Sequence, residues 1–256
     1  MIIYFSGTGN CLQVANQIAE KLNDKVISII DLDPKQDIND EVIGFVFPVY
    51  NYDLPTFVRA KLKELKLKDT SWYFGIIGHG GDKGNALYRL DHILASKGCK
   101  LSYGADLLLP VNSRIMYGRV TDKIEERLTA SVIKLEEISK QILSRETNTN
   151  KIKKNRILSW MTKLGEKEYV QKYVTPVVDP NLCVNCSICI KVCPVDNITE
   201  KDGKAFIEDK CVRCMTCMHW CPQTAIHFNN RKVNKAQQYH HPKVKWRDIE
   251  VNTKYK

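Results

Sequence analysis

The segment IIYFSGTGNCLQVANQIAEKL, residues 2–22, joins an apolar run to an amphipathic stretch through a glycine-rich turn. This order is typical of a β-α-β unit, in which a buried strand leads through a tight turn into a helix. The main-chain N–H groups of such a turn, together with the dipole of the following helix, suit a phosphate dianion. The turn lacks G-x-G-x-x-G and a following Gly-Lys-Ser/Thr, so it gives little support to a dinucleotide or nucleoside triphosphate site.

The same alternation continues to about residue 145. Short apolar runs rich in Ile, Val and aromatic residues predict strands that are buried on both faces. These strands are predicted at 2–5, 26–30, 42–47, 72–77 and 105–109, and helices at 10–22, 56–63, 85–96 and 121–143. The pattern therefore predicts an α/β domain over residues 1–145, with a doubly wound, five-stranded parallel sheet.

Eight of the ten cysteines form an internal repeat. The first cysteine run, CVNCSICIKVCP at 183–194, and the second, CVRCMTCMHWCP at 211–222, both have the spacing C-x2-C-x2-C-x3-C-P. This spacing resembles that of bacterial two-cluster ferredoxins, in which the fourth cysteine of each run binds the other cluster. The resemblance implies a small α+β ferredoxin domain at 176–229 with two [4Fe–4S] clusters, one on Cys183, Cys186, Cys189 and Cys221, the other on Cys211, Cys214, Cys217 and Cys193.

Two structural zinc sites are the alternative, because paired C-x2-C units also suit tetrahedral zinc. Zinc ribbons usually supply two cysteines per knuckle, whereas each run here supplies three and then a C-P pair. The spacing therefore favours iron–sulfur clusters.

The glycine-rich turn resembles the flavodoxin phosphate loop, S/T-x-T-G-x-T, which holds the phosphate of FMN. In this phosphate loop (residues 6–11), Ser6, Thr8, Gly9 and Asn10 match the pattern, with Gly7 between them, and Cys11 replaces the usual Thr or Ser. The replacement removes one hydroxyl donor, which we expect to weaken FMN binding by about 1 kcal/mol.

Two further segments are similar to the flavin-contacting loops of flavodoxins, FVFPVYNYDLP at 45–55 and GIIGHGGDKGNAL at 75–87. Both follow predicted strands at their carboxyl ends, where open parallel sheets bind ligands. The resemblance gives Tyr50 or Tyr52 as the ring that stacks on the flavin. It implies that FMN contacts Pro48, Val49, Tyr50, Asn51, Tyr52, Gly78, His79, Gly80, Gly81 and Asp82, in addition to the phosphate loop. An empty structural turn is the alternative for the phosphate loop.

Three other side chains each allow two interpretations. His79 could donate a proton to the flavin or could be a structural hydrogen-bonded group. Cys11, at a helix start, could be a reactive thiol or a packing residue, and a nearby phosphate would oppose the thiolate. Cys99 is predicted to be a buried apolar residue. No residue is assigned a catalytic role.

The formal net charge of +10 is concentrated outside the two predicted domains. The connector, residues 146–175, contains an amphipathic stretch in which Trp160, Met161 and Leu164 predict a helix packed on one of the domains. The tail, residues 230–256, is basic and polar, and we expect it to be weakly ordered. No nucleic-acid reader motif accompanies these basic segments, so a docking role toward an acidic redox protein is favoured.

The two domains together resemble the fused flavodoxin–ferredoxin proteins of anaerobic bacteria and archaea. The resemblance implies a low-potential electron-transfer protein that passes electrons between FMN and two clusters and couples two-electron to one-electron partners. The alternatives are a flavin-dependent reductase of a small substrate fed by the clusters, and a redox sensor or binding module with an empty flavin site. The chain has no apolar run of about 18 residues and no basic leader, which predicts a cytoplasmic protein without a membrane span.

Overall fold

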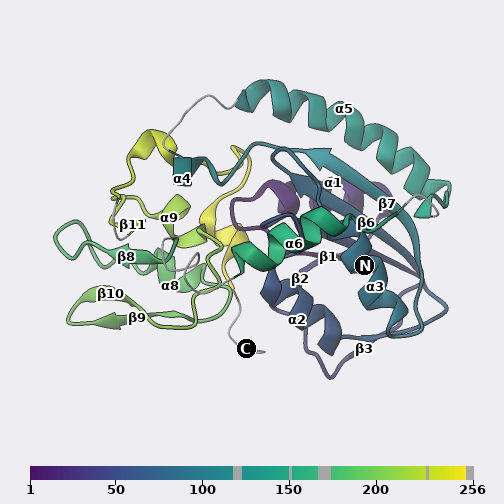
Figure 1. Ribbon diagram of the computed structural model, residues 1–256, viewed down its shortest axis with the longest axis horizontal. Helices are drawn as coiled ribbons and strands as arrows, with labels where there is room; N and C mark the ends of the chain where they lie inside the picture. The colour runs from purple at the N-terminus through teal and green to yellow at the C-terminus, as the bar shows by residue number, and fades with distance from the viewer. Residues whose placement is uncertain (118–122, 150–151, 167–173, 229–230, 252–256) are drawn as a thin grey trace.

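The computed structural model describes residues 1–117, 123–149, 152–166, 174–228 and 231–251. Within them, a five-stranded parallel sheet with the order β2-β1-β4-β6-β7 forms the centre of the larger domain (Figure 1). Its strands are β1 (Ile2–Tyr4), β2 (Val26–Ser28), β4 (Val42–Pro48), β6 (Trp72–His79) and β7 (Leu101–Leu108). The predicted doubly wound α/β sheet is confirmed, although β7 begins at Leu101 instead of residue 105.

Two layers of helices bury the sheet. Phe45 and Phe47 of β4 pack on the face covered by α2 (Thr56–Glu64) and α3 (Ala86–Ala95), whereas Val46 packs on the opposite face with α1 (Asn10–Leu22) and α5 (Ile124–Leu143). Successive side chains of a strand point to opposite faces, which explains why a continuous apolar run predicts a strand buried on both sides. The pair β3 (Asp37–Ile38) and β5 (Lys66–Leu67) and the helix α4 (Arg114–Tyr117) were not predicted, because segments this short carry no periodic pattern.

The smaller domain contains both cysteine runs. It consists of two antiparallel strand pairs, β8–β11 and β9–β10, and two short helices, one within each run. The elements are β8 (Pro176–Val178), α8 (Ile188–Lys191), β9 (Ile198–Lys201), β10 (Lys204–Ile207), α9 (Thr216–Trp220) and β11 (Ile226–Phe228). This confirms the predicted small α+β domain.

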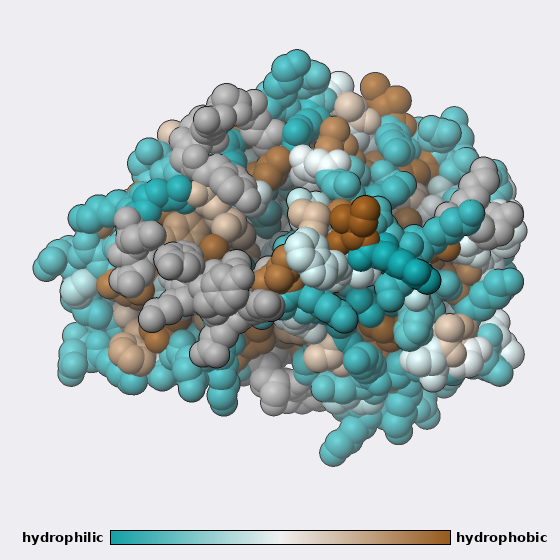
Figure 2. Space-filling view, in the orientation of Figure 1, coloured by the Kyte–Doolittle hydropathy of each residue, from teal (hydrophilic) through white to brown (hydrophobic). Residues whose placement is uncertain are grey.

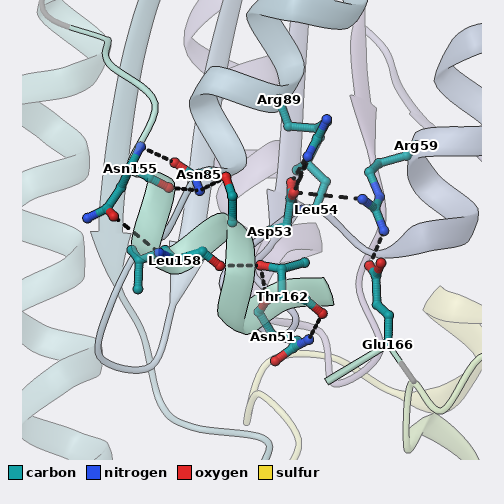
Figure 3. Close-up of polar contacts among 11 residues, drawn as sticks. Asn51, Asp53, Leu54, Arg59, Asn85, Arg89, Asn155, Leu158, Thr162 and Glu166 are labelled. Atoms are coloured by element: carbon teal, nitrogen blue, oxygen red, sulfur yellow. Dashed lines mark hydrogen bonds and ion pairs between the residues drawn. The ribbon is translucent and has the colours of Figure 1, made fainter. Parts of the chain in front are cut away.

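The connector forms α6 (Arg156–Gly165), which lies against the sheet domain through polar contacts (Figure 3). Thr162 exchanges two hydrogen bonds with Asn51, each 2.9 Å long, and Arg59 forms an ion pair with Glu166. The predicted helix is therefore present, but the expected packing of Trp160 is wrong, because its side chain is 62% exposed. Figure 2 shows apolar surface in the region of α6. Residues 167–173, the rest of the predicted amphipathic stretch, lie outside the described residues.

The C-terminal segment (residues 231–251) is packed, so the expectation of a weakly ordered tail is wrong for these residues. Val233, Tyr239, Val244 and Ile249 are buried. Their irregular spacing has no helical or strand period, so their packing could not be predicted from the sequence. The short 3₁₀ helices η2 (Lys235–Gln237) and η3 (Trp246–Ile249) are the regular elements of this segment, and Tyr255 lies outside the described residues.

This segment joins the two domains. The Tyr239 hydroxyl donates to Asn10 Oδ1 at 2.6 Å, and the His241 N–H donates to the Thr8 carbonyl at 2.8 Å. On the other side, Gln238 Nε2 donates to the carbonyls of Met218 and Cys221 at 2.6 and 2.8 Å. Within the described ranges, no helix has the length and apolarity that a membrane crossing requires.

We expect Tyr239→Phe to lower the free energy of unfolding by about 1–3 kcal/mol, because the buried Asn10 Oδ1 would lose its hydrogen bond. The measurement is the urea midpoint of the iron-loaded protein under anaerobic conditions. Tyr88→Phe is the matched control, because the part of the chain that the structure describes offers no hydrogen bond to the Tyr88 hydroxyl. Equal shifts in the two variants would contradict the prediction.

Candidate functional site

A cavity of about 820 Å³ lies at the carboxyl ends of β1, β4 and β6. Thirteen of the sixteen residues predicted to contact a flavin line it: Ser6, Gly7, Thr8, Asn10, Cys11, Pro48, Val49, Tyr50, Asn51, Gly78, His79, Gly80 and Gly81. Three loops that are far apart in the sequence are therefore brought together at one edge of the sheet, as expected for strands that run in parallel.

Gly9, Tyr52 and Asp82 were predicted to belong to this set but are not among the lining residues. Gly9 has a φ of +91° and lies beneath Val244, whose Cβ is 2.8 Å from the position that a Gly9 Cβ would occupy. Tyr52 follows Asn51 in a tight turn, and its carbonyl accepts a hydrogen bond from the main chain of the next loop. Asp82 is exposed, and its carboxylate accepts the Gly84 N–H at 2.7 Å.

The carbonyls of the phosphate loop are held from outside the sheet domain. The Trp220 indole N–H donates to the Gly7 carbonyl at 2.9 Å, and the His241 N–H donates to the Thr8 carbonyl at 2.8 Å. In a trans peptide the C=O and N–H point in opposite directions. The N–H groups that follow these carbonyls, those of Thr8 and Gly9, therefore point away from Trp220 and His241.

The start of α1 has the polarity that a phosphate requires. Gly9 precedes the helix and supplies no capping side chain, and the first turn contains no acidic residue. Ser6 Oγ accepts the Cys11 N–H at 3.2 Å. Since the first turn of a helix carries unpaired N–H groups and partial positive charge, these residues fit the phosphate of FMN.

Cys11 is a buried neutral thiol. Its side chain is 2% exposed, and burial raises its pKa to about 12, an effect that a backbone hydrogen bond from Gly78 partly opposes. The structure therefore favours the packing interpretation over a reactive thiolate. Cys99 is likewise buried, in the core beneath α2 and α3.

A tight turn over residues 50–53 places Tyr50 on the wall of the cavity. The main chains of Tyr50 and Asp53 exchange hydrogen bonds of 2.9 and 3.1 Å, and the two central residues, Asn51 and Tyr52, have positive φ as in a type I′ turn. The Tyr50 hydroxyl lies 3.4 Å from the Cys214 carbonyl, to which it donates. Burial raises the pKa of Tyr50 well above its usual range, so the hydroxyl stays protonated as a donor.

Asp53 anchors this turn. The carboxylate is 1% exposed and accepts hydrogen bonds from Arg89, with the shortest at 2.8 Å (Figure 3). Arg59 approaches the same carboxylate at 3.7 Å and also pairs with Glu166. The loop that carries Tyr50 is therefore fixed by buried charge pairs to α2, α3 and the end of α6.

His79 has a partner on the neighbouring strand. Its Nε2 lies 3.2 Å from Asp106 Oδ2, and Lys83 Nζ donates to the other carboxylate oxygen at 2.7 Å. The hydrogen bond with His79, reinforced by Lys83, holds the pKa of Asp106 well below its usual range. An ionised Asp106 therefore fixes the orientation of the imidazole, which favours the structural interpretation of His79.

The eight cysteines of the repeat form two groups. One small cavity is lined by Cys183, Cys186, Cys189 and Cys221, the outer quartet, and another by Cys193, Cys211, Cys214 and Cys217, the inner quartet. Each group combines three cysteines of one run with the fourth of the other, as crossed ligation requires. Among the described residues, no three His, Cys, Asp or Glu side chains converge on a single metal ion.

The chemistry of the quartets suits a cationic centre. Burial raises the pKa of both Cys189 and Cys214 to about 12, and repulsion from neighbouring cysteines adds to the effect. Four thiolates would therefore not coexist in either cavity without a metal to neutralise them. The N–H groups of Asn197 and Ala225 donate to Cys193 Sγ and Cys221 Sγ, each at 3.2 Å, so both crossing ligands carry the same supporting hydrogen bond.

The second cysteine run also lines the large cavity, which sequence reasoning missed. Cys211, Val212, Arg213 and Met215 contribute to its wall, opposite the loops of the sheet domain. Contacts between domains leave no periodic signal in a sequence, so the contribution of the second cysteine run to the cavity wall could not be predicted. The lining residues Pro110, Val111 and Asn112 follow the carboxyl end of β7, where the rule applied to β1, β4 and β6 could have located them.

Comparison with known protein families distinguishes the same two parts of the chain, the sheet domain and the domain of the cysteine runs. Residues 2–129 match the family described as Flavodoxin, and residues 182–226 match the 4Fe-4S dicluster domain. No curated protein matches the chain.

Solved structures that are similar to parts of the chain include a flavodoxin from Streptococcus pneumoniae TIGR4, with 19% identity, 41% of this chain and 80% of that chain covered, and a TM-score of 0.36. A flavodoxin from the domain Archaea has 18% identity, coverage of 41% and 80%, and a TM-score of 0.33. An FMN-dependent NADH-azoreductase from Bacillus anthracis str. Ames Ancestor has 10% identity, coverage of 55% and 97%, and a TM-score of 0.39.

We expect Gly7→Ala to destabilise the contact between the domains. A Cβ at Gly7 would lie 2.6 Å from Thr216 Oγ1 and 3.2 Å from the Tyr50 hydroxyl, so these two side chains, which lie at the contact between the domains, would have to shift. The expected loss is about 1–3 kcal/mol, as for other overpacked sites, measured as the thermal midpoint of the cluster-loaded, flavin-free protein. Gly81→Ala is the matched control, because nothing lies within 4 Å of its added Cβ. An unchanged midpoint for Gly7→Ala would contradict the prediction.

Proposed function

Because this chain belongs to the flavodoxin family and also carries a 4Fe-4S dicluster domain, we propose that it transfers electrons between FMN and two [4Fe–4S] clusters. When bound, FMN exchanges one or two electrons, whereas each cluster exchanges one at a time. A protein that holds both cofactors can therefore couple two-electron partners to one-electron partners.

One observation carries the proposal: the second cysteine run lines the same cavity as the flavodoxin loops. Cys211 belongs both to this cavity and to the inner quartet, and the Tyr50 hydroxyl donates to the carbonyl of Cys214. A flavin in the cavity and a cluster on the inner quartet would then be neighbours within one packed interface.

The burial of the quartets supports an order for the transfer. Cys214 and Cys217 of the inner quartet are buried, whereas Cys186 of the outer quartet is exposed. Leu182 and Val184, beside the outer quartet in the sequence, are also exposed, by 41% and 60%. Electrons would thus enter or leave at the outer cluster, pass through the inner cluster and reach the flavin.

The roles of the site residues follow from this arrangement. The N–H groups of the phosphate loop and of the first turn of α1 would bind the phosphate, and the loops at Tyr50 and His79 would hold the ring system. The eight cysteines would bind the clusters, and the packed apolar residues around them would limit access of water. Regularly spaced free cysteines of this kind fit a reducing compartment such as the cytoplasm.

The predicted division into 1–145, 146–175, 176–229 and 230–256 remains our proposal for the domain organisation. The C-terminal segment then holds the two cofactor domains together, and the connector helix packs on the sheet domain. Exposed lysines of the C-terminal segment, Lys235, Lys243 and Lys245, form no ion pair with the described residues and would attract an acidic redox partner.

Cofactor analysis of anaerobically prepared protein tests the proposal, with about eight iron atoms and one FMN per chain as the expected result. Crossed ligation adds a sharper test. Cys193→Ala and Cys211→Ala should each remove one cluster, and the double variant should still hold about four iron atoms because both act on the inner quartet. The combination of Cys193→Ala with Cys183→Ala should hold none. If the Cys193→Ala and Cys211→Ala double variant instead holds no iron, and the Cys193→Ala and Cys183→Ala double variant holds about four iron atoms, each run binds its own cluster. Absence of flavin would mean that the cavity binds another ligand.

Electron transfer with a small acidic ferredoxin should depend on salt. We expect the association rate to fall steeply as ionic strength rises, because exposed positive charge steers an acidic partner. Lys235→Gln, Lys243→Gln and Lys245→Gln together should lower the rate several-fold at low salt and flatten this dependence. Lys35→Gln, Lys63→Gln and Lys68→Gln remove the same charge from exposed positions of the sheet domain and are the control. Equal effects of the two triple variants would exclude local steering by the C-terminal segment.

A further inference from the structure

The two cysteine runs are repeats in backbone as well as in sequence. Asn185 and Ser187 of the first run have φ of +53° and +59°, and the equivalent residues of the second run, Arg213 and Met215, have +56° and +60°. The N–H groups that support Cys193 and Cys221 are also equivalent. Since the backbones match, the side chains that differ between the runs show what distinguishes the two cluster sites.

One such difference lies among the residues that line the cavities of the two quartets. Ile188, between the second and third cysteines of the first run, lines the cavity of the outer quartet. The equivalent residue of the second run is Thr216, which lines the cavity of the inner quartet. The outer quartet therefore has an apolar side chain at the position where the inner quartet has a hydroxyl.

The Thr216 hydroxyl is buried without a hydrogen-bond partner. The residue is 2% exposed, and Oγ1 has no partner of suitable geometry in the structure. Gly7 packs directly on it, since a Cβ there would lie 2.6 Å from Oγ1. A buried hydroxyl that pairs with nothing is destabilising, so an acceptor is expected in the completed site.

Cys214, two residues before Thr216, lines the same small cavity of the inner quartet as Thr216. In the thiol form the sulfur is a weak acceptor, but a cluster-bound thiolate or sulfide carries negative charge and accepts more strongly. The Thr216 hydroxyl hydrogen therefore has a sulfur acceptor once a cluster occupies the inner quartet.

We propose that Thr216 donates its hydroxyl hydrogen to a sulfur of the inner cluster and thereby raises the reduction potential of that cluster relative to one without the donor. Hydrogen bonds to the sulfurs stabilise the reduced form, which carries one more negative charge. Thr216 is a positioning and tuning residue: it biases an electron shared by the two clusters toward the one beside the flavin cavity. The proposal rests on the ligand assignment of the proposed function and does not require the flavin.

The repeat supplies both the test and its controls. Thr216→Val keeps the shape and removes the hydroxyl, Thr216→Ser keeps the hydroxyl, and Ile188→Thr introduces one at the outer quartet. We expect Thr216→Val to shift the distribution of one electron between the clusters at least tenfold away from the inner cluster. This corresponds to a change of 59 mV in the difference between the two reduction potentials. The potentials of Thr216→Ser should stay near those of the wild type, and Ile188→Thr should raise the reduction potential of the outer cluster.

The potentials are measured by anaerobic redox titration followed by electron paramagnetic resonance, on protein with about eight iron atoms per chain. After exchange into D2O, the wild type and Thr216→Ser should show one exchangeable deuteron coupled to the reduced inner cluster that is missing in Thr216→Val, beyond the backbone N–D groups common to all three. Unchanged potentials in Thr216→Val, or equal shifts of both clusters, overturn the proposal. If Thr216→Val fails to assemble its clusters, Ile188→Thr decides: a raised potential supports the proposal and an unchanged one overturns it. A wild type without eight iron atoms would instead refute the proposed function.

Discussion

The phosphate loop and the second cysteine run meet in a close contact between the two domains. Gly7 leaves no room for a Cβ against Thr216, and its carbonyl accepts the indole N–H of Trp220. The same loop thus faces the large cavity with its N–H groups and the cluster domain with its carbonyls. Because both domains use opposite sides of one short stretch of backbone, neither site can be displaced without moving the other.

The two cysteine runs differ in their side chains at the positions that contact the phosphate loop. Val192 of the first run corresponds to Trp220 of the second, and only the tryptophan can donate to the Gly7 carbonyl. Ile188 corresponds in the same way to Thr216. The repeat is therefore kept in the ligands and the backbone, whereas these two side chains of the second run contact the neighbouring domain.

Much of the fold could be predicted because its elements are long and periodic, and α1 has the bounds that its apolar spacing indicates. The crossed grouping of Cys193 and Cys221 was implied by the resemblance of the cysteine runs to two-cluster ferredoxins. How the domains and the connecting segments pack together was harder to predict. Trp160 looks like a packing residue in a helical pattern, yet α6 is held by the polar residues Asn51 and Thr162. Tyr239 and Val244 lie in an aperiodic basic segment, and their burial depends on partners more than 200 positions away.

That separation along the chain has a consequence for biosynthesis. A ribosome completes the sheet and the phosphate loop long before it reaches Tyr239, which is 229 positions beyond its partner Asn10. Domains that precede others in the chain generally fold first during synthesis. The nascent protein therefore passes through a stage with a folded flavodoxin domain, all eight cluster cysteines translated and Gly9 still uncovered by Val244. Folding of the sheet domain and closure of the C-terminal segment over its phosphate loop are separated in time by the order in which the chain is made.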